Sequence, residues 1–488
     1  MAVVVPVAQA ARALASDWHP IGDVALIGLR STDLTTSPPT LGQPDSVDAL
    51  GASGIAAHPG PIESYLLALP VLVLGPTIGL ALGAALLNAA MWLIALFVAH
   101  RRGGLLAFAL IAVGVPLAIH GVDPAVLHDP INSDIATVAL VPLVLLTWSM
   151  LDGDLALAPL FALVATLVLQ PHLANATVAA VCVVAGGWGI VRALRRGPTE
   201  RARRMAGLAG LLTLVCWLPP LLAELGPGPS NVVAIWKSIV ADRHVIGLPF
   251  GLGRAATAVA PWPTPYFAQT SRGLAPPGYP GTPQLILGIG LIGLLGSLAM
   301  AARLGGARRL SRFLFLVVAI LVASITTTSL LPWAGLIRPE HARWVWMIGM
   351  LAWAGLALGA WGLASEARRR RSFNVVVGVL LVGAVASSAS LLVGNPLKIN
   401  TGQWAMPRVE PFSQDLRRTM PPGHYLLNPV GSPAQLTFTP GVILDIERHG
   451  YRGYVASGPL NQGYDHRHIF HGEPVRGTIT VMSTIDGA

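Results

Sequence analysis

The stretch Ser16-Asp17-Trp18-His19-Pro20-Ile21-Gly22-Asp23-Val24-Ala25-Leu26 holds the most informative candidate for chemistry. A carboxylate such as that of Asp23 can act as a general base that takes a proton from a reacting hydroxyl. It can equally cap a helix or lie solvated in a loop. The small residues Gly22 and Ala25 suggest that Asp23 lies in a helix already begun, which makes Asp17 the better cap candidate. The residues alone leave both roles of Asp23 open.

Candidate cations gather further along the chain. The segment 336–344 places four ionisable side chains at the ends of two apolar runs: Arg338, Glu340, His341 and Arg343. Charged residues at membrane depth are costly and usually mark function. Arginines here could also extend to lipid headgroups as ordinary anchors. Other basic or titratable candidates lie at predicted helix ends and in loops: Arg30, His58 and His172.

The composition identifies the class of protein that carries these residues. Of 488 residues, 53% are hydrophobic and 11% are charged, whereas soluble domains carry about 25% charged residues. Such a chain cannot cover itself with a water-compatible surface, which excludes a cytosolic enzyme, a disordered scaffold and a small disulfide-rich protein. The net charge of +9 does not indicate nucleic acid, because the arginines stand in short blocks between apolar runs.

The apolar runs predict an α-helical polytopic membrane protein, since about 20 apolar residues span a bilayer. Asp152-Gly153-Asp154 predicts a tight turn between two of the spans. The run from Ala2 to Ala15 is too short, and we expect it to be the outer part of a first helix whose beginning is missing, which makes eleven spans. The other ten are 77–99, 104–120, 135–151, 155–170, 174–193, 205–223, 283–303, 313–332, 343–365 and 373–394.

The placement of arginine predicts the orientation. Four short loops, beginning near Arg101, Arg192, Arg303 and Arg368, hold 16 of the 32 basic residues and fall on one side if the spans alternate. The positive-inside rule makes that side the cytoplasm. The longer loops then face outward, and so does the chain from residue 395 onward. We expect the reaction site on that side as well. The outward loops are 16–62, 121–134, 224–282 and 333–342.

Two interfacial helices and a separate C-terminal domain complete the predicted organisation. Amphipathic stretches near Ala25–Leu34 and Ser64–Gly75 would lie along the membrane surface within or beside the first outer loop. Residues 1–394 would form the membrane module, and 395–488 a small extracytoplasmic α/β domain with strands near 425–427, 442–444 and 478–481. The histidines of that domain match no zinc-binding spacing, and the two cysteines lie in apolar runs. No metal site is predicted.

The motifs resemble the membrane-embedded glycosyltransferases of the GT-C superfamily, most closely their actinobacterial members. The resemblance extends over nearly the whole chain, although each motif is short. It rests on an Asp between two juxtamembrane helices just after the first span and on these segments: Gly22-Asp23-Val24-Ala25-Leu26, Pro38-Pro39, His58-Pro59-Gly60-Pro61, Asp129-Pro130-Ile131-Asn132, Gln170-Pro171-His172-Leu173, Trp217-Leu218-Pro219-Pro220 and Arg343-Trp344.

The resemblance implies a reaction and a set of roles. The expected donor is a sugar on a polyprenyl phosphate dissolved in the bilayer, and the acceptor is an envelope glycan or lipid on the outer side. Asp23 would be the general base, as the inverting mechanism requires. The donor phosphate and substrates would contact Arg30, His58, His172, Arg338, His341 and Arg343. Better-known members carry an Asp-Glu pair where this chain has Asp23-Val24, so the need for a divalent cation stays open; no other cofactor is expected.

Two other classes of function fit parts of the sequence. A transporter or flippase of a lipid-linked precursor would also have many spans, but its ionisable residues would lie near the membrane midplane. A scaffolding protein with an inert envelope domain would leave Asp23 and the cluster around Arg338 unexplained. The outer-boundary position of the ionisable groups favours the enzyme.

Overall fold

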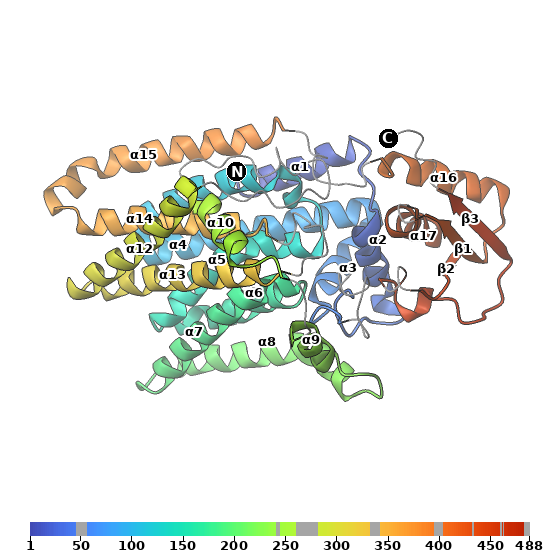
Figure 1. The fold of residues 1–488 in the computed structure, drawn as a ribbon, viewed down its shortest axis with the longest axis horizontal. Coiled ribbons are helices and arrows are strands. Elements are labelled where there is room, and N and C mark those ends of the chain that lie inside the picture. Colours follow the sequence, from blue (N-terminus) through green and yellow to red (C-terminus); the bar gives the residue numbers. More distant parts are fainter. Residues whose placement is uncertain are drawn as a thin grey trace.

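The computed structural model describes nine stretches of the chain, in which helices are the dominant element: residues 1–44, 56–240, 245–259, 282–331, 342–394, 404–431, 434–458, 461 and 463–482. Figure 1 shows a helical bundle along the long axis, with a smaller domain holding the strands at one end. The N-terminal helices α2 and α3 lie between the two.

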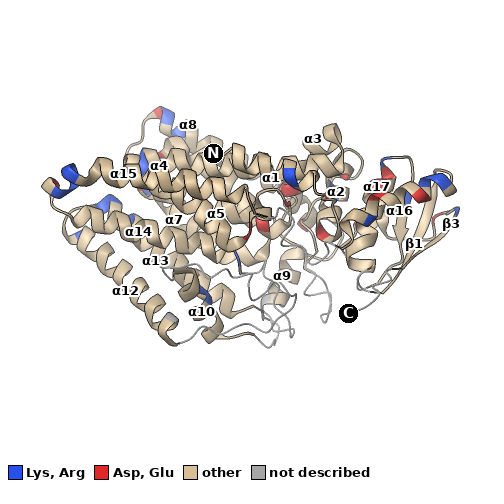
Figure 2. Cartoon of the chain, turned by 90° about the horizontal axis from the view of Figure 1, so that it is seen from above, with Lys and Arg blue, Asp and Glu red and all other residues tan. Residues whose placement is uncertain are grey.

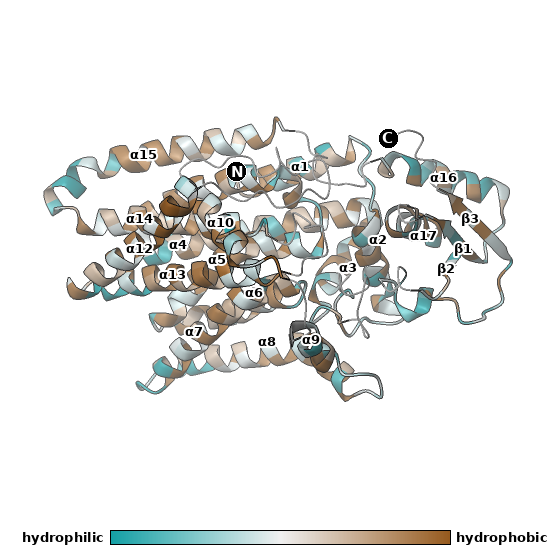
Figure 3. Ribbon diagram, viewed as in Figure 1, coloured by the Kyte–Doolittle hydropathy of each residue, from teal (hydrophilic) through white to brown (hydrophobic). Residues whose placement is uncertain are grey.

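Eight described helices are long and apolar enough to cross a membrane, and they account for most of the predicted spans. Brown and white, the colours of hydrophobic and intermediate residues, predominate along these helices in Figure 3. Helix α4 breaks at Gly104, whose φ of 65° is not helical, and thus covers two predicted spans. The total of eleven spans stays a prediction. The eight are α4 (Pro76–Val122), α5 (Asn132–Leu151), α7 (Ala176–Leu194), α8 (Glu200–Leu225), α12 (Thr282–Leu304), α13 (Arg308–Ser329), α14 (Val345–Leu363) and α15 (Glu366–Leu391).

Helix α5 forms the centre of the bundle, and α8 lies at its edge. The most apolar window of α5 is 94% buried, and α5 packs against α4, α6 (Ala158–Leu169), α7, α13 and α14. The corresponding window of α8 is only 11% buried. Because an apolar helix exposed in this way must meet lipid rather than water, α8 has a broad membrane-facing surface.

Three short helices surround the first outer loop. Helix α1 (Val4–Leu14) packs along α4 and matches the predicted partial first span. Helices α2 (Gly22–Thr32) and α3 (Ile62–Leu74) confirm that the two stretches predicted as interfacial helices are helical, and their position at the membrane surface stays a prediction. Gly75, with a φ of 82°, separates α3 from α4. These three short helices thus precede the first long apolar helix of the described chain.

Part of the segment predicted as the outer loop 224–282 packs into the bundle instead. Helix α10 (Leu248–Val259) contacts α12, α13 and α14, and Trp353 Nε1 donates to Val259 O at 3.0 Å. A Cβ atom on Gly251 would lie 2.4 Å from Ile325 O, so glycine permits this close packing. Twelve residues are too few for a span, which is why hydropathy did not reveal this helix.

Charged side chains collect at the bundle end remote from the strands (Figure 2). Asp152, in the predicted turn after α5, forms ion pairs with three arginines: Arg102, Arg309 and Arg312. The last two lie 3.1 and 2.7 Å from its carboxylate. The basic loops after different spans thus meet at one end, as simple alternation of the spans requires.

The C-terminal domain is a small α/β unit. Its three strands are β1 (His424–Val430), β2 (Arg452–Val455) and β3 (Gly477–Met482), all parallel in the order β2-β1-β3. Helices α16 (Met406–Thr419) and α17 (Thr439–Glu447) pack together. The predicted strand 442–444 is wrong, because these residues lie in α17. A short apolar run cannot by itself distinguish a strand from a buried helix, and Pro440 lies in the first turn of this helix, where proline is favoured.

The C-terminal domain shares a hydrophobic core with the first outer loop. Side chains of α2, α3, α17 and the sheet form one buried cluster. A Cβ atom on Gly28 would lie 2.6 Å from Leu444 Cδ2, so α17 and α2 touch closely. The ion pair between Arg467 and Asp33 crosses the same interface. The predicted boundary at residue 395 separates two compositions but not two independent cores.

We expect removal of residues 400–488 to destabilise the membrane module. The deletion would expose apolar side chains of α2 such as Val24 and Ile27, each 2% exposed, and burying a side chain of this size is worth about 1.5–3 kcal/mol. Thermal unfolding in detergent should show a large fall in midpoint for the truncated chain. A truncated protein that unfolds at the wild-type temperature would show that the shared cluster contributes little.

Candidate functional site

The ends of several helices converge beside the C-terminal domain, opposite the arginine-rich end. They bring together the first turn of α2, the loop segments 41–44 and 56–60, the segment 128–132 before α5, and residues 170–172 after α6. Arg343, just before α14, reaches the same region through Asp134 in α5. These segments contain most of the described residues that the sequence predicted as functional.

Asp23 lies in the first turn of α2 and is partly exposed. Gln43 Nε2 lies 3.5 Å from its Oδ1, and Gln43 Oε1 lies 3.5 Å from Asn132 Nδ2. Asp17, the cap candidate favoured by the sequence, does not cap this helix. It follows α1 with a φ of 57°, and the cap residue of α2 is Ile21. Asp23 is thus a helical carboxylate whose polar neighbours come from two other segments.

Little room remains on one side of Asp23. A Cβ atom on Gly22 would lie 3.2 Å from Leu436 O of the C-terminal domain, and the φ of Gly22 is +50°. Gly22 is therefore needed for both its conformation and the close approach. The C-terminal domain therefore fills the space on this side of Asp23.

His58 and His172 are neighbours although they are far apart in the sequence. Their ring centroids lie 4.5 Å apart. His58 is buried, and its backbone pairs with residues 42 and 43 of the first outer loop. Gly42 N donates to His58 O at 2.9 Å, and His58 N donates to Gln43 O at 2.8 Å. His172 Nδ1 accepts from Ala174 N at 3.0 Å. The pair therefore joins the first outer loop to the end of α6.

Gln170 connects three helices at the same place. Its Oε1 accepts from Ile62 N at 3.1 Å, and its Nε2 donates to Cys216 O at 2.9 Å. Gly60 N donates to Gln170 O at 3.2 Å, and a Cβ on Gly60 would lie 2.4 Å from the Gln170 side chain. Gln170 is fully buried and holds the start of α3 against α6 and α8. The signal in the sequence was an amide residue at the end of an apolar run.

Arg30 is occupied by oxygen atoms of the protein. Its Nη1 lies 2.5 Å from Asp465 Oδ1, and its Nη2 donates to Leu41 O (2.5 Å) and Gly42 O (3.3 Å). The side chain is only 6% exposed. These contacts favour a positioning role over the predicted contact with a phosphate. Arg30 holds the loop segment 41–44, which contains Gln43, and joins this segment to the C-terminal domain.

Arg343 is also buried. It is 1% exposed and forms an ion pair with Asp134, which is completely buried at the start of α5. Arg338 and His341, the other predicted phosphate ligands, lie outside the described residues. Of the predicted cluster, only Arg343 can be placed, and it lies beneath the site rather than on its surface.

A buried group of titratable side chains lies beside this ion pair. Burial raises the pKa of Asp129 to about 7, against the opposing effect of Arg343. Burial lowers the pKa of the neighbouring His128 to about 3. Burial, reinforced by the charge of Asp134, also raises the pKa of Glu63 in α3 well above its ordinary value. Glu63 had not been singled out in the sequence, and an acid within an apolar helix was the signal that could have found it.

The pKa of Asp129 makes a prediction about stability. The unfolded carboxyl loses its proton near pH 4, but the folded one holds it to about pH 7. The native protein therefore loses stability as the pH rises between these values, by on the order of a few kcal/mol. Asp129→Asn stays neutral and should remove this loss. Midpoints of thermal inactivation at pH 5 and pH 8 test this prediction, and Asp17→Asn, at an exposed position, is the control. If the midpoint changes between the two pH values by the same amount in Asp129→Asn and in the wild type, the prediction is wrong.

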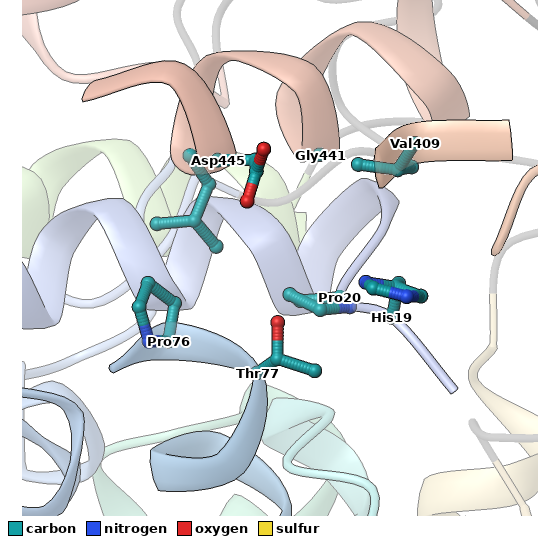
Figure 4. A pocket seen from close by; sticks show the side chains of 8 residues that line it. His19, Pro20, Pro76, Thr77, Val409, Gly441 and Asp445 are labelled. Carbon is teal, nitrogen blue, oxygen red and sulfur yellow. The ribbon is translucent and has the colours of Figure 1, made fainter. Parts of the chain in front are cut away.

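Two features of the described residues carry no assigned chemistry. Among them, no group of three or more His, Cys, Asp or Glu side chains is arranged to hold a metal ion. A small hollow lies where the first outer loop, α4 and the C-terminal domain meet, and Figure 4 shows Thr77 and Asp445 turned toward it. Its lining does not include Asp23. The hollow is lined by His19, Pro20, Pro76, Thr77, Val409, Gly441, Leu444 and Asp445.

Comparison with known proteins identifies the fold. No family profile matches the chain, and no curated protein matches it in sequence. Among solved structures, the chain is similar to the crystal structure of ArnT from Cupriavidus metallidurans bound to undecaprenyl phosphate. The TM-score is 0.53 at 13% sequence identity, and the alignment covers 95% of this chain and 86% of ArnT. The chain thus shares its fold with ArnT, and its eight long apolar helices make it a multi-pass membrane protein, as the sequence predicted.

Proposed function

We propose that the chain is an inverting glycosyltransferase that moves a sugar from a polyprenyl phosphate to a cell-envelope glycan or lipid. The observation that carries this proposal is the fold shared with ArnT, whose structure contains undecaprenyl phosphate. The position of Asp23 adds support, because this carboxylate lies partly exposed where the ends of the spans meet the first outer loop.

Asp23 would remove the proton from the acceptor hydroxyl as that oxygen attacks the anomeric carbon. The bond to the donor phosphate breaks on the opposite face, so the anomeric configuration inverts and the polyprenyl phosphate leaves. Gln43 and Asn132 would orient the carboxylate. Cationic groups are needed where charge builds on the phosphate, and His58, His172, Arg338 and His341 are the candidates.

The transporter alternative remains the second candidate. A lipid flippase would be expected to place ionisable groups near the midplane of the membrane. The described charged side chains gather instead at the two ends of the bundle (Figure 2). This distribution favours a reaction at the membrane boundary, with a lipid donor that reaches the site from within the bilayer.

Transfer can be tested directly with the full chain reconstituted in vesicles. A synthetic polyprenyl-phosphate sugar labelled in the sugar is added together with an envelope fraction as acceptor. We expect label to move to the acceptor while free polyprenyl phosphate accumulates. Movement of intact donor between leaflets without loss of its sugar would overturn the transferase and support the flippase.

The proposal also requires a defined orientation. Reporter fusions after Arg102, Arg196, Arg309 and Arg371 should read as cytoplasmic, because these arginines lie in short basic loops. Fusions after residue 395 should read as extracytoplasmic, together with the site. A cytoplasmic C-terminal domain would invert the scheme and separate the site from an envelope acceptor.

A further inference from the structure

Helix α9 (Asn231–Val240) lies beside the site-side end of α8 (Figure 1). It exposes several apolar side chains. Val232 and Trp236 are each 63% exposed, and Val233 is 48% exposed. At helical spacing these three residues share one face, with Lys237 at its edge. Asn231 lies on the other side and is buried. The helix is therefore amphipathic, with its apolar face turned outward.

The corner between α8 and α9 is held by specific hydrogen bonds. Glu224 accepts from Ser230 Oγ at 2.6 Å and from Val232 N at 2.9 Å. Ser230 Oγ in turn accepts from Val233 N at 3.2 Å. Two of the backbone N–H groups at the start of α9, which have no partner within the helix, are thereby satisfied. This arrangement fixes the direction in which α9 leaves α8.

Asn231 connects α9 to the first outer loop. Ala57 N donates to its Oδ1 at 2.8 Å, and its Nδ2 donates to Ala57 O at 3.0 Å. Both backbone groups of Ala57 are thus held by one buried side chain. The next residue is His58, whose backbone pairs with Gln43. A movement of α9 would therefore be passed directly to the segment that carries His58.

The outward face of α9 continues a lipid-facing surface. Exposed apolar side chains follow the last turns of α8 up to the corner: Leu218, Leu221, Leu222 and Leu225. Helix α8 is a membrane span with little of its apolar window buried. Tryptophan and lysine are residue types typical of the membrane interface. A bilayer surface is accordingly the occupant that matches this face in both shape and chemistry.

We propose that α9 lies in the bilayer interface on the site side and that Asn231 makes it a support for the His58 segment. The membrane contact of α9 does not depend on the reaction. The importance of holding His58 rests on the proposed function, since it matters only if His58 contacts a lipid-linked donor. The experiments therefore measure the lipid exposure of α9 and the mobility of the first outer loop, neither of which depends on sugar transfer.

The membrane contact is tested by a spin label at Trp236→Cys in the full chain, in a Cys182→Ala, Cys216→Ala background reconstituted in lipid nanodiscs. Oxygen, which concentrates in lipid, should increase the relaxation rate of this spin label several-fold more than a polar, water-soluble nickel complex does. A label at Thr478→Cys, exposed in the C-terminal domain, should show the reverse preference. Equal access of the nickel complex to both labels would overturn the membrane contact.

The support role is tested by a label at Thr40→Cys, an exposed position on the first outer loop. Asn231→Ala removes both hydrogen bonds to Ala57 and should make the loop more mobile, which narrows the lines in the EPR spectrum of this spin label. Lys237→Ala should leave the spectrum unchanged. Asn231→Asp keeps only the acceptor and should give an intermediate spectrum, which decides the matter if Asn231→Ala fails to fold. An unchanged spectrum in both Asn231 variants would overturn the support role. Absence of sugar transfer by the wild type would refute the proposed function alone.

Discussion

Replacing Asp23 by Asn is expected to lower kcat for sugar transfer by at least about a hundredfold, because general-base assistance is typically worth about 10²–10⁴-fold. Asn has the same size and can still hydrogen-bond to Gln43, but it cannot take a proton from the acceptor. Binding of the polyprenyl-phosphate donor should stay near normal, since the lost interaction develops only in the transition state. Initial rates at saturating donor, with donor affinity measured separately, separate the two effects.

Asp17→Asn is the matched control for this experiment. Asp17 is exposed and adopts the left-handed conformation, which Asn tolerates as well as Asp does. Its exchange should leave both kcat and stability near wild type. If Asp17→Asn loses activity and Asp23→Asn does not, the base is misassigned although the fold stands. If both variants transfer sugar at the wild-type rate, the proposed mechanism fails.

The membrane helices could be predicted from the sequence because their signal is one-dimensional. A run of about 20 apolar residues is enough to identify a span. The predicted start of the span 104–120 and the predicted end of the stretch Ser64–Gly75 coincide with the helix breaks at Gly104 and Gly75. The juxtamembrane helix α2 was visible for a related reason, since its apolar spacing starts just after α1. Helix α10 and the strand β2 were missed because each is too short to rise above its surroundings.

The partners within the site could not be predicted, because they depend on three-dimensional proximity. Arg30 and Asp465 lie 435 residues apart in the sequence, yet their side chains are within 2.5 Å. No local pattern distinguishes an arginine that will find such a partner from one that will bind a ligand. The sequence predicted His58 and His172 as substrate contacts, and the structure brings their rings together. The sequence also predicted that Arg30 and Arg343 contact substrate or phosphate, whereas the structure pairs each of them with a carboxylate.

The ion pair of Arg343 and Asp134 leads to the second large prediction. Arg343→Gln should lower the free energy of unfolding by about 3–5 kcal/mol, since removal of one partner leaves a buried charge without compensation. Arg343 is 1% exposed and Asp134 is fully buried, so water cannot replace the missing partner. Chemical or thermal denaturation of the purified variant in detergent measures this loss. A role in binding donor phosphate predicts something different, namely weaker donor binding at unchanged stability.

The double variant Asp134→Asn, Arg343→Gln separates these two roles. Removing both charges leaves no uncompensated ion, so a structural pair predicts that the double variant is more stable than Arg343→Gln alone. Donor affinity should then recover together with the folded fraction. If Arg343 instead holds the donor phosphate, the double variant should bind donor as poorly as the single one, because neutralising Asp134 restores no cation to the site. The burial of both side chains makes us expect the first result: Arg343 keeps the ends of α5 and α14 together, and the phosphate is held by groups nearer to Asp23.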